Sequence, residues 1–272
     1  MSAFERRLQA AWRTNNSLVC IGLDPEPARL PSAVRARPQA IFEFNKAIVD
    51  ATCDLVAAYK PQFAHYAAER AEEQLERTIG YIRERAPTAL IILDSKRGDI
   101  GSTAERYARE AFDRYGADAV TVNPYLGQDS LQPFLERGDR GVIILCRTSN
   151  PGARDFQDLR LADGRTLYQT VADKVANDWN SKGNCMLVVG ATYPDELGEL
   201  RARVGDLPFL VPGVGAQGGD VAQAVTRGRT ANGTGLLVSS SRAILYAGSG
   251  ADFAAAARAA AADLQAAINE HR

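Results

Sequence analysis

The sequence ALIILDSKRGDI, residues 89–100, places a continuous apolar run directly before a cluster of charged residues. An uninterrupted apolar run is typical of a parallel β-strand that is covered on both faces. Side chains two positions apart in a strand point to the same side, so Asp94 and Lys96 are expected to project together from its carboxyl end. Gly98 then allows the chain to turn and bring Asp99 alongside them. This stretch therefore predicts a buried strand that ends in a chemical site.

Similar runs recur along the chain and give the sequence its period. Together with the first, they cover residues 18–24, 55–60, 89–96, 119–124, 141–147, 186–191, 209–213 and 235–240. From Asp24 to Ser240 the intervals average about 31 residues, which is the size of one strand–helix unit. Helix-like segments lie between the runs. The pattern predicts an α/β protein, a (β/α)8 TIM barrel, with a doubly wound open sheet as the alternative.

Length and composition limit the domain organisation and the partners. A chain of 272 residues is long enough for one large barrel or for two smaller domains. No Pro- or Ser-rich linker interrupts the pattern, so we expect residues 1–272 to form a single (β/α)8 barrel domain. The 32 Lys and Arg residues nearly balance 33 Asp and Glu residues. This balance argues against a nucleic-acid-binding protein, which normally needs a basic surface.

The N-terminal segment, the lengths of the apolar stretches and the cysteines bear on where in the cell the protein is found. Phe4, Leu8 and Trp12 recur at four-residue spacing among charged residues, which predicts an extra N-terminal amphipathic helix and not a signal peptide. No stretch is apolar for the roughly 18 residues that a membrane span requires. The four cysteines show no Cys-x-x-Cys spacing and no nearby histidine pair. We therefore expect a cytoplasmic protein with reduced thiols, no metal site and no membrane partner.

Lysines end two consecutive apolar runs, which is unusual for positions chosen by packing alone. Active sites of TIM barrels lie at the carboxyl ends of the strands, so Lys60 and Lys96 are expected to meet there. Carboxylates within ~4–6 Å of an ammonium group raise its pKa. Lys96 beside Asp94 and Asp99 is thus predicted to be a fixed ammonium and proton donor, not the neutral amine of a Schiff-base enzyme. The alternative is a solvated charge cluster on a loop.

A glycine-rich loop follows the seventh apolar run. Gly213, Gly215 and Gly218 fit the pattern G-x-G-x-x-G, but a dinucleotide site would place it after the first strand of a βαβ unit. In a barrel, the loops after the seventh and eighth strands commonly bind phosphate through exposed backbone N–H groups. Arg242 follows the eighth run and can add a bidentate contact. The loop is predicted to bind phosphate, with a tight turn that binds no ligand as the alternative.

The stretch from residue 91 to residue 104 resembles the signature of the orotidine 5′-phosphate decarboxylase family. That signature is an apolar strand followed by D-x-K-x-x-D-[IV]-[GP]-x-T, and every position is filled here. IGLD at 21–24, AAYKPQFA at 57–64, TSNPG at 148–152 and VPGVGAQGGD at 211–220 follow in the family's order. The resemblance covers nearly the whole chain and is strongest to the longer bacterial branch. The segment after Lys60, HYAAERAEE, departs from the family's pattern.

The resemblance implies an alternating ionic network of Lys60, Asp94, Lys96 and Asp99. It also implies a homodimer with shared active sites, because the family's last aspartate and its threonine, here Asp99 and Thr103, reach into the partner's site. The reaction would be decarboxylation of orotidine 5′-phosphate to uridine 5′-phosphate, the last step of de novo pyrimidine synthesis. It would need no metal and no cofactor, and the Lys96 ammonium would stabilise and protonate the carbanion at ring carbon C6.

The resemblance also implies how the nucleotide is held. Asp24 and Lys60 would bind the ribose, Ser149 would bond the pyrimidine ring, and Gln217 with Arg242 would grip the 5′-phosphate. The polar segment 149–164 is long for a loop, and we predict that it closes over the substrate.

Two other functions stay open. A Mg²⁺-dependent sugar-phosphate decarboxylase or aldolase of the same superfamily shares D-x-K-x-x-D, but Lys60 stands where such enzymes tend to have an acidic metal ligand. A catalytically inactive nucleotide-binding barrel is the second alternative. The set of charged strand ends argues against it, because charges in a pocket are costly to keep.

Overall fold

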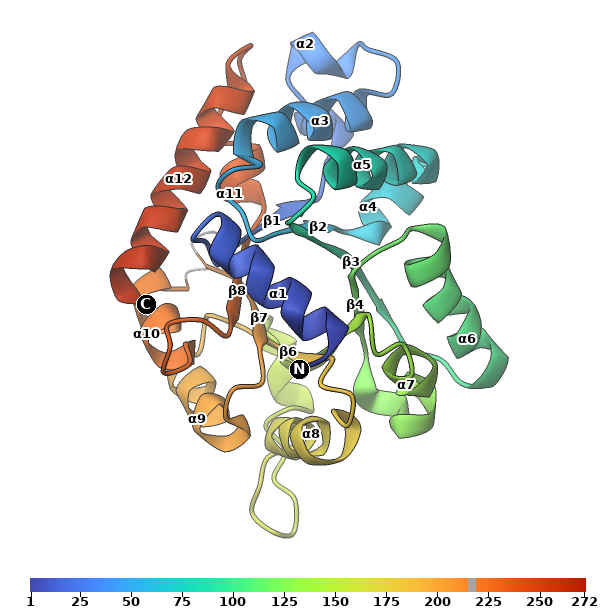
Figure 1. The fold of residues 1–272 in the computed structure, drawn as a ribbon, viewed down its shortest axis with the longest axis vertical. Helices are drawn as coiled ribbons and strands as arrows, with labels where there is room; N and C mark the ends of the chain where they lie inside the picture. The colour runs from blue at the N-terminus through green and yellow to red at the C-terminus, as the bar shows by residue number, and fades with distance from the viewer. Residues whose placement is uncertain (215–218) are drawn as a thin grey trace.

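A computed structural model describes residues 1–214 and 219–272 of the chain. Its eight parallel strands pair in sequence order, and β8 pairs with β1 to close the barrel (Figure 1). The strands are β1 Val19–Leu23, β2 Ala58–Pro61, β3 Leu90–Arg97, β4 Ala119–Val122, β5 Gly141–Arg147, β6 Cys185–Val189, β7 Phe209–Pro212 and β8 Leu236–Ser240. The prediction of a (β/α)8 barrel is confirmed, and the doubly wound alternative is wrong.

Helices connect the strands and surround the barrel (Figure 1). The α-helices are α1 Ala3–Thr14, α2 Ser32–Arg35, α3 Ala40–Thr52, α4 Phe63–Ala67, α5 Glu72–Arg85, α6 Gly101–Arg109, α7 Gln128–Leu135, α8 Leu167–Lys174, α9 Pro194–Val204, α10 Val221–Gly228, α11 Arg242–Leu245 and α12 Phe253–His271. Short 3-10 helices are η1 Pro27–Arg29, η3 Pro124–Leu126 and η4 Pro151–Asp155, and π-helical turns η2 Glu110–Arg114 and η5 Val175–Trp179 extend α6 and α8. None of the helices within the described ranges is long and apolar enough to cross a membrane.

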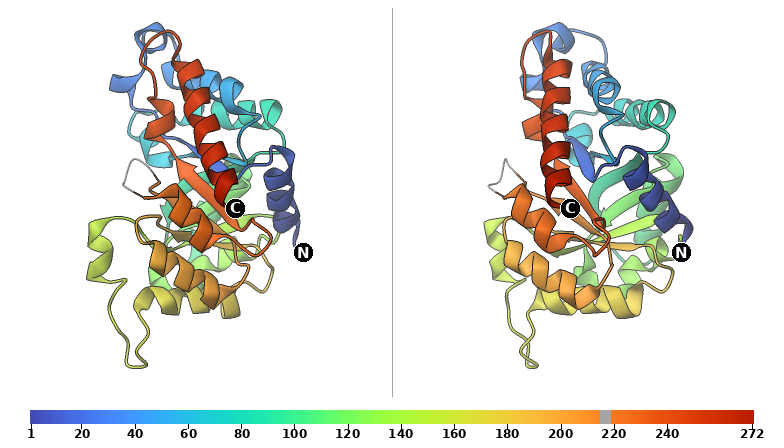
Figure 2. Two further views of the ribbon diagram at one scale, coloured as in Figure 1. Left: turned by 90° about the vertical axis from the view of Figure 1, so that its left-hand side faces the viewer. Right: turned by 60° about the vertical axis from the view of Figure 1, so that its left-hand side comes forward.

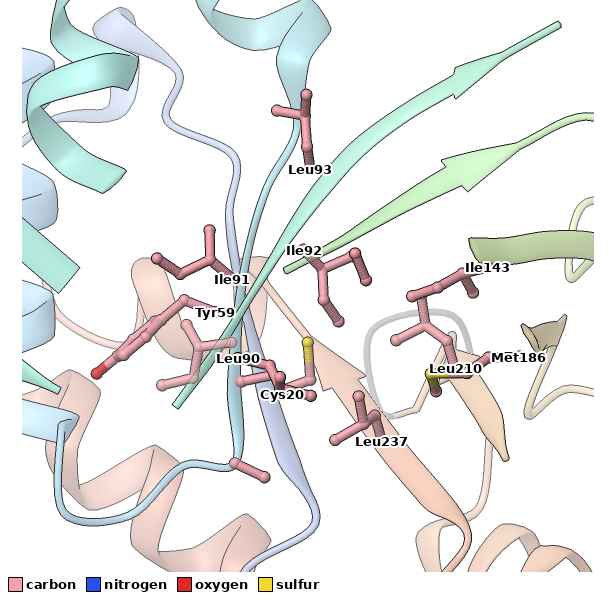
Figure 3. Close-up of a cluster of buried hydrophobic side chains, with 14 of the residues drawn as sticks. Cys20, Tyr59, Leu90, Ile91, Ile92, Leu93, Ile143, Met186, Leu210 and Leu237 are labelled. Carbon is pink, nitrogen blue, oxygen red and sulfur yellow. The ribbon is translucent and has the colours of Figure 1, made fainter. Parts of the chain in front are cut away.

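The strands are buried along nearly their whole length, as the continuous apolar runs predict. Every residue of β1, β4, β6 and β8 is buried. Inside the barrel, Ile92, Ile143, Met186, Leu210 and Leu237 lie toward one another from five different strands (Figure 3). Tyr59 and Ile91 point the other way, toward the helices (Figure 3). Two apolar layers on opposite sides of each strand therefore hold the strand ends in place.

One irregularity lies at the charged end of β3. The register between β3 and β4 shifts between Leu93 and Arg97. Within this bulge Lys96 has a φ of 47°, in the left-handed region that non-glycine residues rarely adopt. Bulges re-aim side chains next to active sites, so this strand does not simply continue the alternation of its first half.

Helix α1 covers the amino-terminal end of the barrel (Figures 1 and 2). Phe4, Leu8 and Trp12 are all buried, which confirms the amphipathic helix predicted from their spacing. The indole Nε1 of Trp12 donates a hydrogen bond to the carbonyl oxygen of Leu236, the first residue of β8, at 2.9 Å. At the start of β5, Gly141 leaves room for the ring of Phe4.

A substitution at Gly141 tests this seat for α1. A Cβ atom at Gly141 would lie 2.3 Å from Cζ of Phe4 and 2.8 Å from Cβ of Ala119. We expect Gly141→Ala to lower the free energy of unfolding by about 1–3 kcal/mol, the usual cost of overpacking a core. The matched control is Gly80→Ala in α5, where a Cβ meets nothing within 4 Å. That change should raise stability by about 0.5–1 kcal/mol because glycine weakens a helix interior. Urea unfolding of both variants distinguishes them. Equal stability of Gly141→Ala and the wild type would contradict the claim that the Phe4 ring needs the space at Gly141.

Candidate active site

The carboxyl ends of the strands surround a cavity of about 190 Å³. Its walls come from β1, β2, β3, β7 and β8 and from the residues that follow them. They are Asp24, Lys60, Gln62, Asp94, Pro212, Gly213, Val214, Ser239, Ser240, Ser241 and Arg242. Five residues selected from the sequence, Asp24, Lys60, Asp94, Gly213 and Arg242, therefore line one cavity although they are far apart along the chain.

An ionic network includes two residues of the cavity wall, Lys60 and Asp94, and also Lys96, which is not among the residues that line the cavity. Nζ of Lys60 lies 2.7 Å from Oδ2 of Asp94, and Nζ of Lys96 lies 2.7 Å from Oδ1 of the same carboxylate. The Lys60 and Asp94 side chains are only 8% and 7% exposed, whereas that of Lys96 is 45% exposed. One buried carboxylate is thus shared by a buried ammonium and an accessible one.

Thr121 in β4 completes the network and was not singled out from the sequence. Its hydroxyl donates to Oδ1 of Asp94 at 2.8 Å. It also accepts hydrogen bonds from the backbone N–H groups of Ser95 and Lys96, at 3.0 and 2.9 Å. These three bonds use the full capacity of a hydroxyl group. Thr121 therefore holds both the carboxylate and the left-handed turn at Lys96. The sequence feature that could have identified Thr121 is a hydroxyl side chain within the apolar run 119–124.

The charges of the network determine the protonation of its buried members. Burial by itself raises the pKa of Asp94, but the charges and hydrogen bonds of Lys60 and Lys96 outweigh it and lower the pKa well below its usual range. Burial lowers the pKa of Lys60, but the charges of Asp94 and Asp24 outweigh it and raise the pKa above its usual range. Asp94 is accordingly a carboxylate and Lys60 an ammonium throughout the neutral range.

Asp24 supplies an unused acceptor at the cavity wall. Among the described residues, its buried Oδ1 has no hydrogen-bond partner. A buried acceptor without a partner is rare in folded proteins, and a ligand is one of the ordinary explanations. Gly22 keeps this region open, because a Cβ there would lie 2.8 Å from Cβ of Ser241 and 3.2 Å from Oδ2 of Asp24. The arrangement suits a ligand hydroxyl that donates to Asp24.

Asp99 and Thr103 do not join this network within the chain. Oδ1 of Asp99 accepts a hydrogen bond from the N–H of Ile100 at 2.8 Å, and within the described ranges Asp99 forms no ion pair. Thr103 lies exposed on the first turn of α6. The expectation that Gly98 turns Asp99 alongside Lys96 is therefore not met within one subunit, because the chain leaves the β3 bulge outward into α6.

The segments on either side of the cavity complete the description. Ser149 packs against the end of β6, where a Cβ on Gly190 would lie 2.9 Å from its Cβ. The predicted lid, residues 149–164, begins with the 3-10 helix η4 and continues into a hairpin, residues 157–168, that projects from the body, yellow-green in Figure 2. The atypical segment after Lys60 forms the short helix α4 and leads into α5. The predicted phosphate-loop residues Gly215, Gln217 and Gly218 lie outside the described residues.

Fold and site together define a (β/α)8-barrel protein with an ionic site at the carboxyl ends of its strands. Over residues 17–260 the sequence matches the Orotidine 5′-phosphate decarboxylase / HUMPS family. The chain belongs to this family, as expected from the motif after β3.

Individual relatives agree with this assignment. An orotidine 5′-phosphate decarboxylase of Aromatoleum aromaticum is 60% identical over 269 residues, covering 99% of both chains. One of Cellvibrio japonicus is 59% identical over 272 residues, again covering 99% of each. Among solved structures, the OMP decarboxylase of Leishmania donovani aligns with a TM-score of 0.83 at 38% identity, covering 98% of this chain and 99% of that one.

Removing the Asp94 charge tests the electrostatics of the site. Asp94→Asn leaves the buried Lys60 ammonium without its 2.7 Å partner, and breaking a buried ion pair costs about 3–5 kcal/mol. Burial disfavours the Lys60 ammonium, and in the variant the charge and hydrogen bond of Asp94 no longer oppose it, although the Asp24 charge remains. We therefore expect the pKa of Lys60 to fall, so that the folded variant binds fewer protons than the unfolded chain as pH rises. The variant should therefore gain stability between about pH 7 and pH 10.

The wild-type pair behaves differently over this range. Its lowered Asp94 pKa stabilises the fold above about pH 4 and that contribution is lost on acidification, while the raised Lys60 pKa contributes below about pH 10 and is lost at higher pH. Urea unfolding at pH 7 and pH 9 measures both proteins. Asp195→Asn, which changes a carboxylate outside the network whose side chain is 88% exposed, is the control. A pH-independent stability of Asp94→Asn would contradict the proposed charge state.

Proposed function

We propose that the protein decarboxylates orotidine 5′-phosphate to uridine 5′-phosphate without a metal or cofactor. The observation that carries this proposal is the Asp94 carboxylate held between Lys60 and Lys96 at the cavity. Loss of CO₂ leaves a carbanion at ring carbon C6, and a fixed ammonium stabilises such a charge where it develops. Family membership supports the same reaction.

Lys96 is the ammonium that acts on C6 in this proposal. The Lys60 side chain is 8% exposed and bonded to Asp94, whereas 45% of the Lys96 side chain is open to a ligand. Thr121 fixes the backbone N–H of Lys96, so the side chain leaves from a held position. As CO₂ departs, the ammonium first stabilises the electron pair at C6 and then gives it a proton.

Asp94 has two roles next to Lys96. It holds both lysines in place through its two carboxylate oxygens, and in this proposal it faces the substrate's carboxylate. Two like charges ~4 Å apart at an effective dielectric of about 20 oppose each other by roughly 4 kcal/mol. Release of that repulsion helps the reaction, but stabilisation of the carbanion by Lys96 is the main effect.

The rest of the nucleotide is bound away from the reacting carbon. Asp24 accepts a ribose hydroxyl through its unused Oδ1, with Lys60 beside it. The 5′-phosphate is bound by Arg242, which is exposed at the start of α11, and by the glycine-rich loop that begins at Gly213. Ser149 bonds the pyrimidine ring from the end of β5. Binding energy from these remote contacts is available to stabilise the transition state.

The charges at the site disfavour the two alternatives. A divalent cation bound by Asp94 would lie close to both ammonium groups, each 2.7 Å from a carboxylate oxygen. In the described part of the chain no group of three or more His, Cys, Asp or Glu side chains is arranged to hold a metal ion. An inactive barrel would keep these buried charges at a cost and without a use.

We also propose a homodimer in which Asp99 and Thr103 complete the partner's active site. Asp99 has no ion-pair partner in the described part of its own subunit. Large apolar side chains that follow the neighbouring strands β3 and β4 are exposed: Ile100, next to Asp99 in the chain, by 57%, and Tyr125 and Leu126 in η3 by 78% and 48%. Neighbouring exposed apolar residues commonly mark a protein interface.

The cellular setting follows from the reaction. The step is the last of de novo pyrimidine synthesis, and we place it in the cytoplasm. All four cysteines are free thiols in this structure, as expected for a reducing compartment. Burial raises the pKa of Cys20 to about 12, so this thiol beside the network stays protonated and takes no part in catalysis.

The direct test of the reaction is loss of orotidine 5′-phosphate absorbance with chelator-treated protein. We expect turnover that is unchanged by added Mg²⁺. Lys96→Ala is expected to abolish turnover while uridine 5′-monophosphate still binds in calorimetry, because the lysine acts on the ring carbon and not on the phosphate or ribose. Absence of turnover in the wild type, or turnover only with Mg²⁺, would refute the proposed function.

Mixed subunits test the shared site. When Lys96→Ala and Asp99→Ala subunits are combined, both lesions fall in one site of the heterodimer and the other site is intact. Random mixing should restore about one quarter of the wild-type sites, since half of the dimers are mixed and each has one intact site. Turnover of the mixture is compared with that of each variant alone. No recovery in a verified heterodimer would place Asp99 in its own subunit's site.

A further inference from the structure

Arg147, the last residue of β5, is a buried charge that the proposed reaction does not use. Only 1% of its side chain is exposed. Nη2 lies 3.3 Å from Oδ1 of Asp158 in the hairpin. The guanidinium carbon lies 4.3 Å from the ring centre of Tyr193 and 5.6 Å from that of Tyr168. One carboxylate and two aromatic rings thus surround the guanidinium group.

Packing alone does not explain an arginine at this position. A buried ion pair is often no more stable than well-packed apolar side chains of the same volume. Among the described residues, Nε of Arg147 has no hydrogen-bond partner, so its solvation is incompletely replaced. The charge instead links two parts of the chain: the end of β5 and the hairpin that carries Asp158.

Gln157 connects Arg147 to Thr148, the residue before Ser149. Its Oε1 accepts hydrogen bonds from the N–H of Thr148 at 2.9 Å and from Nη1 of Arg147 at 3.5 Å. Its Nε2 donates to Oγ1 of Thr148 at 2.9 Å. Both contacts of Oε1 are donors, so the amide is fixed in one orientation. The Thr148 hydroxyl accepts from Gln157 and gives its only proton to Oδ1 of Asn150, at 2.7 Å.

Ser149 lies between two residues that are both held by this arrangement. Thr148 and Asn150 are joined by the Thr148 hydroxyl, which Gln157 holds. On the other side, the N–H of Gly190 donates to the carbonyl oxygen of Arg147 at 2.8 Å. A Cβ on Gly190 would lie 3.0 Å from the backbone N of Ser149, so the segment packs directly on β6.

We propose that Arg147 is a positioning residue that fixes Ser149 for contact with the pyrimidine ring, acting through Gln157 and Asp158. The inference rests on the proposed function, because it assigns Ser149 to the substrate. The guanidinium group orients Gln157 and, through Asp158, holds the hairpin against the end of β5. Gln157 in turn fixes the backbone N–H of Thr148. Without this link the substrate must order the segment when it binds, so KM should rise more than kcat falls.

Arg147→Lys is the main test, because it keeps the positive charge and removes the planar fork. We expect kcat/KM for orotidine 5′-phosphate to fall at least about tenfold, mainly through KM. In a Ser149→Ala background the same change should alter kcat/KM less than about twofold, because residues that act through one another are not additive. Equal effects of Arg147→Lys in both backgrounds, or no effect in either, would overturn the proposal.

Arg201→Lys is the matched control for a general loss of stability. Arg201 also lies over an aromatic ring, 3.9 Å from the centre of Phe209, and donates to the carbonyl oxygen of Gly228 at 2.7 Å. It does so at the amino-terminal end of the barrel, away from Ser149. We expect it to lower Tm and to leave kcat/KM unchanged. If both arginine variants lower kcat/KM equally, Arg147 acts through the fold and the proposal is wrong.

Two further measurements keep the test decisive. If Arg147→Lys does not fold, Asp158→Asn weakens the same link from a side chain that is 38% exposed, and the same coupling to Ser149→Ala is expected. Amide hydrogen exchange reports the link independently of turnover. The backbone amides of residues 148–158 should exchange faster than in the wild type in Arg147→Lys, and at the wild-type rate in Arg201→Lys. A wild type without decarboxylase activity would refute the proposed function, whereas unchanged exchange in this segment would refute the link itself.

Discussion

The site depends on one buried carboxylate shared by two ammonium groups. The Asp94 carboxylate oxygens lie 2.7 Å from Nζ of Lys60 and from Nζ of Lys96, and Oδ1 also accepts a hydrogen bond from the Thr121 hydroxyl. These groups come from β2, β3 and β4, so their distances depend on the strand register. Closure of the barrel fixes that register, because no strand has a free edge along which to slip. An unpaired Lys60 or Asp94 would cost several kcal/mol, so the fold and the ionic network constrain each other.

Much of this architecture was predictable because the signals are local. Continuous apolar runs mark buried parallel strands, and the residues at their ends identify the mouth of a barrel without knowledge of any contact. Asp24, Lys60, Asp94 and Arg242 were found in this way and do line one cavity. The amphipathic helix α1 was equally readable, since its apolar spacing is contained within the helix.

Features that depend on departures from regular geometry were not predictable. Simple alternation places Asp94 and Lys96 on one side, but the structure achieves their contact through a bulge with Lys96 in a left-handed conformation. The bulge is stable because Thr121, 25 residues away from Lys96, binds its backbone N–H. The same bulge sends Asp99 outward. The link from Arg147 to Gln157 likewise joins residues whose polar pairing has no sequence pattern.

The position of α1 has a consequence for the order of events during synthesis. The Trp12 indole donates a hydrogen bond to a carbonyl oxygen 224 residues further along the chain, so a helix made before any strand of the barrel docks on the eighth strand. At about 5–20 residues per second, the ribosome needs on the order of 10–45 seconds to add that length. Throughout this interval the apolar face of Phe4, Leu8 and Trp12 has no completed barrel to cover it. The nascent chain therefore exposes the apolar face of an amphipathic helix, which is the kind of segment that chaperones bind.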